Sequence, residues 1–159
     1  CIAQNNPKLL KEYPLIGIYQ INKVIEVVEE ALNDNIIQAI ATDEIPQLNT
    51  RILRTNKIKE IIPISRGQKN KCSFCNTKSH KGEIVSYTIE DIATRVKKAL
   101  QEGVQEILLT SQDNGCYGVD IGTNLVTLLE TLTTVQGEFK IQVGMMKIDY
   151  VSNILNQLI

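Results

Sequence analysis

Apolar residues recur at helical spacing in several stretches of the chain. The first stretch covers 21–32, with lysine and glutamate between its apolar positions, and predicts a helix that ends at Asn33-Asp34-Asn35. A second predicted helix begins after Thr88, where Asp91 follows three residues on as in a capping box, and ends before Gly103. In this second helix we expect a solvent-facing set of Arg95, Lys97 and Lys98, and a core-facing set of Ile89, Ile92, Ala93, Val96, Ala99 and Leu100.

Short apolar runs predict strands at 15–19, 61–64, 106–110 and 139–143. From residue 58 onward, strand and helix patterns alternate three times; the third predicted helix carries Leu125, Leu128, Leu129 and Leu132, and the last is capped by Asp149. This alternation predicts an α/β fold with a parallel sheet. Ligands of such folds bind at the carboxyl ends of the strands, so we expect the chemistry in loops 66–86, 111–123 and 144–149.

Residues 33–56 are polar, lack a periodic pattern and contain Pro46, and we interpret the middle of this stretch as a linker. The predicted division is 1–35 for the end of a first α/β domain, 36–57 for the linker, and 58–159 for the first three βα units of a larger barrel or curved sheet. The chain opens on Cys1 rather than on methionine, and it closes inside an apolar pattern. We therefore expect it to be a piece of a longer protein.

Composition narrows the class of protein but does not identify a partner. The 17 Lys and Arg residues against 18 Asp and Glu residues give a formal net charge of −1, so bulk charge gives no support for a nucleic-acid partner. Apolar residues make up 43% of the chain, which argues against wholesale disorder. No run approaches the roughly 18 apolar residues of a membrane span. Since the start does not resemble a signal peptide, we expect a reducing cytoplasm.

The four cysteines are Cys1, Cys72, Cys75 and Cys116. In a reducing compartment, a pair spaced as Cys72-x-x-Cys75 is typical of a metal or redox site rather than of a structural disulfide. The loop around this pair is therefore the first place to look for chemistry.

That loop, residues 66–78, reads Arg-Gly-Gln-Lys-Asn-Lys-Cys-Ser-Phe-Cys-Asn-Thr-Lys and resembles the cluster loop of radical S-adenosylmethionine enzymes, whose signature is Cys-x-x-x-Cys-x-x-Cys. Thiolates suit iron–sulfur clusters because they are soft, anionic donors. Other segments narrow the resemblance to the archaeal and eukaryotic radical S-adenosylmethionine tRNA methylthiotransferases. These segments are 1–4, 7–10, 16–17, 20–24, 82–83, 86–87, 102–107, 109–125 and 143–146.

The resemblance implies a partial βα barrel preceded by the end of the family's N-terminal domain. It implies a tRNA substrate, in which N6-threonylcarbamoyladenosine beside the anticodon receives a 2-methylthio group. It also implies S-adenosylmethionine and two [4Fe–4S] clusters as cofactors. Cys72 and Cys75 then match ligands of the radical S-adenosylmethionine cluster, and Cys1 matches one ligand of the auxiliary cluster. The catalytic residues and the oligomeric state stay open.

The polar residues Ser111, Gln112 and Asp113 follow the second strand of the alternating region. In the family reading they would contact the amino or carboxylate end of S-adenosylmethionine, and Gly144-Met145-Met146 would flank its adenine. The alternatives are ordinary turn and cap chemistry for the first group and core packing for the methionines.

The sequence departs from the family pattern at Gln68, where the signature has its first cysteine. A carboxamide oxygen is a neutral and weak donor to iron compared with a thiolate. We therefore expect poor assembly or easy loss of the cluster, and an inactive protein. The chain departs from the family pattern at three further places. Lys81 and Gln142 each stand where the family usually has an arginine, and Lys147-Ile148 stands where it usually has Asn-Pro.

Two other hypotheses are open at this point. The chain could be a cluster-free relic that binds tRNA through a basic loop containing Lys69, Lys71, Lys78 and Lys81, unless these lysines form only a solvated surface. It could also be a small zinc-binding module that uses Cys72, Cys75, His80 and Cys116. The alternatives to zinc binding are that His80 is a solvated loop histidine and that Cys116 is a packed thiol.

Overall fold

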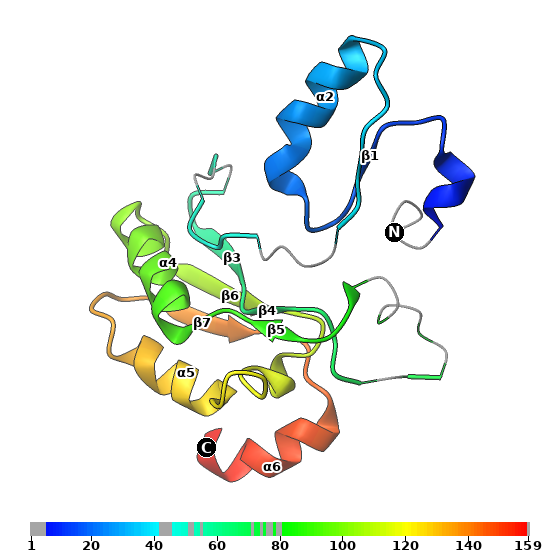
Figure 1. Ribbon diagram of the computed structural model, residues 1–159. Helices are drawn as coiled ribbons and strands as arrows, with labels where there is room; N and C mark the ends of the chain where they lie inside the picture. Colours follow the sequence, from blue (N-terminus) through cyan, green and yellow to red (C-terminus); the bar gives the residue numbers. More distant parts are fainter. Residues whose placement is uncertain are drawn as a thin grey trace. The chain divides into compact units, whose positions relative to one another are not determined.

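A computed structural model describes residues 6–41, 46–50, 53–54, 56–70, 72–73, 75, 78 and 81–158 (Figure 1). The chain forms two compact units. The first consists of residues 1–47 and 70–82, and the second of residues 48–69 and 83–159. The chain thus leaves the second unit after Lys69 and returns to it at Glu83. The division at residues 35 and 57 stays a prediction.

The first unit contains a β–α–β arrangement. After the short 3-10 helix η1 (Pro7–Leu10) come β1 (Leu15–Ile16), the 3-10 turn η2 (Ile21–Lys23), α2 (Val24–Leu32) and β2 (Gln38–Ala39). The two strands pair in parallel. The helix expected over 21–32 is confirmed, although its first three residues are 3-10. The sequence gives no sign of β2, because two residues are too few for a strand pattern to be recognised.

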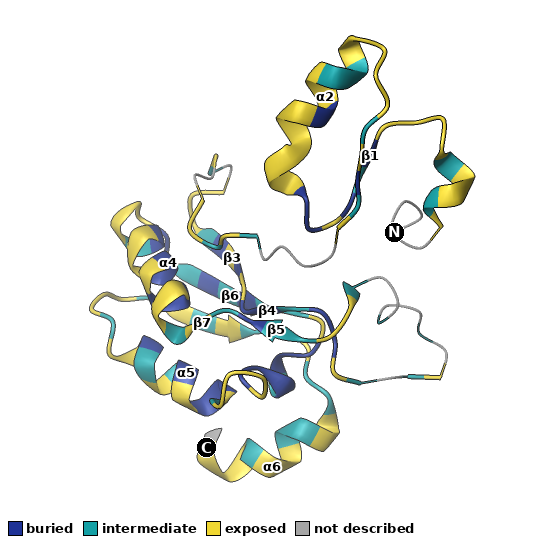
Figure 2. Cartoon of the chain, in the orientation of Figure 1, coloured by how far each residue is buried: buried dark blue, intermediate teal, exposed yellow. Residues whose placement is uncertain are grey.

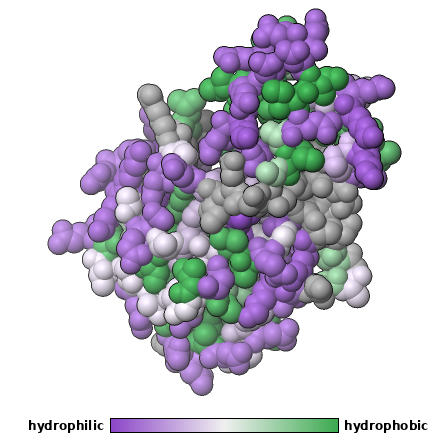
Figure 3. Space-filling model, in the orientation of Figure 1, coloured by the Kyte–Doolittle hydropathy of each residue, from purple (hydrophilic) through white to green (hydrophobic). Residues whose placement is uncertain are grey.

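The apolar side of α2 is only partly covered. Val27 is 3% exposed, whereas other apolar residues of the helix are open to solvent; these are Val24, Ile25, Val28 and Leu32. Hydrophobic surface is visible on this unit in Figure 3. An apolar arc of this width is typical of a helix that packs on a sheet.

The second unit is built on a three-stranded parallel sheet in the order β3–β6–β7, formed by Lys59–Pro63, Glu106–Thr110 and Lys140–Val143. One helix follows each strand along the chain: α4 (Ile89–Gln101), α5 (Leu125–Thr133) and α6 (Ile148–Leu158). The predicted threefold alternation is confirmed, and the fold is α/β. None of the helices in the described residues has the length and apolar character needed to cross a membrane.

The core of the second unit joins the sheet to α4 and α5. Figure 2 shows buried residues on these two helices, whereas α6 is intermediate or exposed. The side chains at the centre of this core have no exposed surface; they include Ile62, Ile107, Leu109, Ile92, Val96, Leu125 and Leu128. The apolar stripes that predict α4 and α5 from the sequence are therefore the faces that pack in the core.

Both ends of α4 follow the sequence expectation. The Asp91 N–H donates to Thr88 Oγ1 at 3.1 Å, as the capping box predicts. Gly103 adopts a positive φ of 89° just after the helix, a conformation that glycine takes without a steric penalty. These two signals set the length of the helix.

The expectation that Arg95 faces solvent is wrong, because this residue is 2% exposed. Its Nε donates to Glu60 Oε1 at 2.8 Å, and its Nη2 donates to the same oxygen. Glu60 lies on β3 and is 6% exposed. A buried guanidinium is tolerated when it has a buried carboxylate as its partner, and periodicity within one helix cannot show a partner on another element.

Arg54 extends this ion pair into a network. Its guanidinium contacts Glu60 and also Glu102, to which its Nε donates at 2.8 Å. The hydrogen bond from Arg54 lowers the pKa of Glu102. Burial by itself would lower the pKa of Arg54. The hydrogen bonds to Glu102 and Glu60 outweigh this effect, so the pKa of Arg54 is raised. The network fastens residues 53–54 to β3 and to the end of α4.

Asp149 does not cap the last helix. The helix α6 begins at Ile148, so Asp149 lies inside its first turn. An acidic residue in the first turn still interacts favourably with the helix dipole. Asp149 therefore indicates the start of the helix, but it lies two residues after the capping position.

Candidate functional site

The cysteine loop begins and ends on a short antiparallel ladder. This ladder joins β4 (Ser65–Arg66) to β5 (Val85–Ser86), both in the second unit. Between them, residues 70–82 belong to the first unit. Cys72 and Cys75 are half-buried, and the Cys75 N–H donates to the Cys72 carbonyl at 3.1 Å. The two sulfur-bearing residues thus share one turn.

Gln68 lies in the second unit just after β4 and is 8% exposed. It follows Gly67, which has a positive φ of 73°. At the position where the resemblance leads us to expect a first cysteine, the chain therefore has a buried carboxamide rather than a solvated one. Burying such a group is costly unless it has hydrogen-bonding partners.

The described residues do not fit a cluster held by three thiolates. They contain no group of three or more His, Cys, Asp or Glu side chains that could hold a metal ion. The loop supplies two thiols. In place of a third thiol, Gln68 supplies a carboxamide, which is a weak ligand for iron. Cys1, His80 and Lys71 lie outside the described residues, so the auxiliary-cluster ligand and part of the zinc and basic-loop hypotheses are not described.

The loop after β6 contains the three residues expected to contact S-adenosylmethionine. Asp113 is 3% exposed, and its Oδ1 accepts hydrogen bonds from the N–H groups of Gly115 at 3.2 Å and Lys147 at 3.1 Å. Ser111 Oγ donates to Asn114 Oδ1 at 2.8 Å, whereas Gln112 is exposed. Asp113 therefore performs cap and loop chemistry. The contact of these residues with S-adenosylmethionine stays a prediction.

Asn114 is a key residue of this loop that sequence reasoning misses. It has no exposed surface, and both its backbone N–H and its Nδ2 donate to the Met145 carbonyl, at 3.0 and 3.1 Å. A Cβ on Gly144 would come within 2.9 Å of Asn114 Nδ2, so the contact needs a glycine there. Together with the Asp113–Lys147 bond, this contact joins the loops after β6 and β7. Nothing in a single sequence signals a partner 31 residues away.

The same loop is fastened to β5, the strand that closes the cysteine loop. Ser86 Oγ donates to Asp120 Oδ1 at 2.6 Å, and the Ser86 N–H donates to Asp120 Oδ2 at 2.7 Å. The Gly118 N–H donates back to Ser86 Oγ at 3.0 Å. Tyr117 is fully buried and its hydroxyl donates to the Tyr87 carbonyl at 2.8 Å. Burial, followed by the charges of nearby acidic groups, raises the pKa of Tyr117, so its hydroxyl stays a donor.

Cys116 is a packed thiol. It is 1% exposed, and its Sγ donates to the Asp113 carbonyl at 3.1 Å. Burial raises the pKa of Cys116 to about 11, with a further contribution from the charge of Asp113. A thiol with this pKa is neutral at physiological pH.

The other residues that we expect to depart from the family pattern lie at three different places. Gln142 is exposed on β7, and its Oε1 accepts from Lys59 Nζ at 3.1 Å. Lys147 contributes its backbone N–H to the contact with Asp113. Lys81 belongs to the first unit, and its carbonyl accepts a hydrogen bond from Tyr19.

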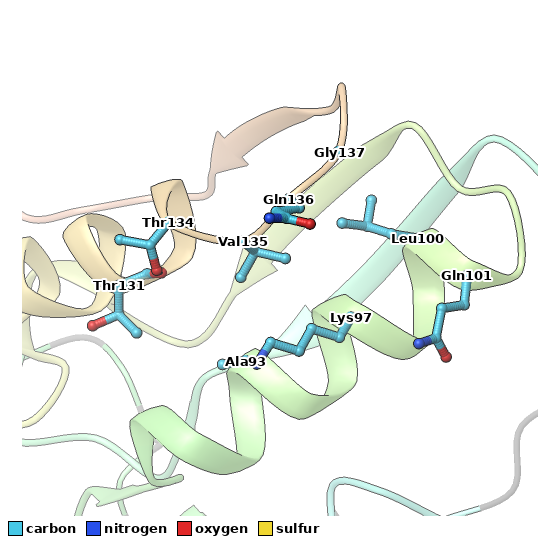
Figure 4. A pocket seen from close by; sticks show the side chains of 9 residues that line it. All are labelled: Ala93, Lys97, Leu100, Gln101, Thr131, Thr134, Val135, Gln136 and Gly137. Atoms are coloured by element: carbon cyan, nitrogen blue, oxygen red, sulfur yellow. The ribbon is translucent and has the colours of Figure 1, made fainter.

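A groove of about 610 Å³ lies between the C-terminal ends of α4 and α5 (Figure 4). Its apolar lining includes Leu100 and Val135, and its polar lining includes Lys97, Gln101 and Gln136. These helix ends precede β6 and β7, so the groove lies at the amino ends of the strands. Ligands of parallel α/β sheets bind at the opposite edge, and we assign the groove no role in the site.

No protein-family model matches the chain. It is 35% identical over 164 residues to a Pyrococcus abyssi protein named "Probable threonylcarbamoyladenosine tRNA methylthiotransferase", with 100% of this chain and 39% of the relative aligned. It is 38% identical over 168 residues to the human protein "Threonylcarbamoyladenosine tRNA methylthiotransferase", with 99% of this chain and 29% of the relative aligned. A Drosophila melanogaster protein of the same name is 36% identical over 169 residues. The chain thus spans less than half the length of these curated relatives.

Proposed function

Since this chain belongs to the family of threonylcarbamoyladenosine tRNA methylthiotransferases, we propose that it acts in tRNA modification, as the section of such an enzyme that carries the radical S-adenosylmethionine cluster loop. The acceptor is N6-threonylcarbamoyladenosine in tRNA, and the group transferred is methylthio. The cofactors of the intact enzyme are S-adenosylmethionine and [4Fe–4S] clusters, and its compartment is the cytoplasm.

The observation that carries this proposal is an alignment at 34–38% identity that reaches across essentially the whole chain in archaeal and eukaryotic relatives. The fold is consistent with it. The strands β3, β6 and β7 are parallel and lie in chain order, so the loops after them emerge at one edge of their sheet. We propose that residues 58–159 are the first three βα units of a partial barrel, and that residues 1–35 end the domain before it.

The same proposal holds that this chain does not retain the radical S-adenosylmethionine cluster. Cys72 and Cys75 supply two anionic sulfur donors, whereas the buried Gln68 supplies a neutral carboxamide. A cluster attached at two iron atoms instead of three is expected to dissociate readily.

Replacing Gln68 by cysteine is expected to restore iron binding. After anaerobic reconstitution with iron and sulfide, followed by desalting, the wild-type chain should keep well under one iron per chain. The Gln68→Cys variant should approach the roughly four irons of one cluster. The measurement is iron and acid-labile sulfide per chain.

A matched control is Gln68→Ala, which removes the carboxamide without adding a thiol and should bind no more iron than the wild type. A second control is Cys72→Ala in the Gln68→Cys background, which returns the loop to two thiols and should lose the restored iron. Equal iron in the wild type and in Gln68→Cys would show that the third thiol is not what limits binding.

A further inference from the structure

A side-chain hydrogen bond links the β–α–β part of the first unit to its cysteine-bearing segment. The Tyr19 hydroxyl donates to the Lys81 carbonyl at 2.6 Å, across 62 residues of sequence. Tyr19 is 6% exposed, and both residues belong to the first unit. An O–H···O distance of this length is typical of a well-formed hydrogen bond.

The segment that carries Tyr19 is itself well fixed. The Gly17 N–H donates to the Ala39 carbonyl at 2.6 Å, which continues the β1–β2 ladder. The Gln20 N–H donates to the Gly17 carbonyl, and the Gln20 side chain, which has no exposed surface, donates to the Ala41 carbonyl at 3.2 Å. The ring of Tyr19 is thus presented by a turn that is anchored on both sides.

The acceptor lies at the end of the cysteine-bearing segment. Lys81 follows Cys75 by six residues and closes a helical turn in which the Gly82 N–H donates to the Lys78 carbonyl at 2.9 Å. Gly82 has a positive φ of 70°, and the chain returns to the second unit just after it. The Lys81 carbonyl therefore lies where the chain that carries Cys72 and Cys75 returns to the second unit.

We infer that Tyr19 is a positioning residue, whose hydroxyl holds the Cys72–Cys75 loop on the β–α–β unit through the Lys81 carbonyl. That the held loop serves iron binding rests on the proposed function. The contact between Tyr19 and Lys81 does not rest on the proposed function, because it is present in the chain without any metal. Tyr19→Phe removes the hydroxyl and keeps the ring, so the apolar packing of the residue is preserved while the Lys81 carbonyl loses its donor.

The test is the alkylation rate of each cysteine in the reduced, iron-free chain, followed by mass spectrometry of the cysteine peptides. In Tyr19→Phe, Cys72 and Cys75 should react about threefold to tenfold faster than in the wild type, the range that loss of one hydrogen bond gives to a local opening. Tyr13→Phe is the matched control, since Tyr13 is 60% exposed, and should leave both rates unchanged. Cys116 reports on the second unit and should stay unreactive throughout.

Rates for Cys72 and Cys75 within about twofold of the wild type would overturn the inference. So would an equal acceleration at Cys116, because it would indicate general loosening rather than release of one loop. Iron retention by Gln68→Cys, with and without Tyr19→Phe, separates the two proposals. If Gln68→Cys binds no iron while the alkylation difference holds, the proposed function fails and the positioning role of Tyr19 stands.

Discussion

Glu60→Gln is expected to lower the free energy of unfolding by about 3–5 kcal/mol, the usual cost of removing one partner from a buried ion pair. The carboxylate of Glu60 binds Arg95, which is 2% exposed, and also binds Arg54. Without its charge, the guanidinium of Arg95 stays in the core with no buried counter-charge. Urea denaturation of wild type and variant, followed by circular dichroism, measures the difference.

Two comparisons separate burial from charge. Glu102→Gln removes the carboxylate of Glu102, whose side chain is 41% exposed, and should cost much less. The double variant Glu60→Leu/Arg95→Met removes both buried charges and should recover much of the stability that Glu60→Gln loses. A loss for Glu60→Gln no larger than that for Glu102→Gln would contradict the role of the buried network.

The network also predicts a pH dependence. The pKa of Glu102 is lower in the folded chain than its ordinary value, so the folded state holds its proton less firmly than the unfolded state. The stabilisation is therefore present above the ordinary glutamate pKa and is lost as the pH falls through the lowered pKa. The stability difference between wild type and Glu102→Gln should shrink over that acidic range.

Gly118→Ala is the second substitution with a large expected effect. Gly118 has a positive φ of 81°, which costs an alanine about 1–2 kcal/mol. In addition, its Cβ would lie 2.6 Å from the backbone carbon and oxygen of Thr123, and such overpacking typically adds about 1–3 kcal/mol. We expect a total loss of about 2–5 kcal/mol in urea denaturation, because a backbone neighbour cannot rotate away.

Gly122→Ala is the matched control, four residues further along the same loop. Gly122 has a similar φ of 71°, but nothing lies within 4 Å of its added Cβ. This variant should lose only the conformational part, about 1–2 kcal/mol. If Gly118→Ala and Gly122→Ala were equally destabilised, the close approach to Thr123 would not be energetically important.

Most of the second unit could be predicted from the sequence, because its signals are local. The strands β3, β6 and β7 and the helices α4 and α5 follow from hydrophobic period, capping residues and a C-terminal glycine. The error at Asp149 concerns only the start of a helix, whereas the error at Arg95 arises because its partner lies elsewhere in the chain. Arg95 reads as a surface residue until Glu60 is brought beside it.

The candidate site divides in the same way. The spacing of Cys72 and Cys75, and the substitution at Gln68, can be read from one loop. The clasp between Asn114 and Met145, the Ser86–Asp120 bonds and the Tyr19–Lys81 bond depend on contacts between distant segments. Asp113 shows most clearly how far a single sequence can predict a role. An aspartate can contact a ligand or cap a loop, and in the structure Asp113 caps a 3-10 turn.

We propose that the Cys72–Cys75 loop descends from a radical S-adenosylmethionine cluster site whose third thiolate is missing at Gln68. The most direct measurement is the EPR spectrum of the reduced chain after anaerobic reconstitution, recorded with and without S-adenosylmethionine, for the wild type and for Gln68→Cys. We expect a cluster signal that changes on adding S-adenosylmethionine in Gln68→Cys, and no such signal in the wild type. Two results would contradict this descent of the loop. One is a wild-type signal that responds to S-adenosylmethionine in the same way, and the other is a Gln68→Cys cluster whose signal does not change on adding S-adenosylmethionine.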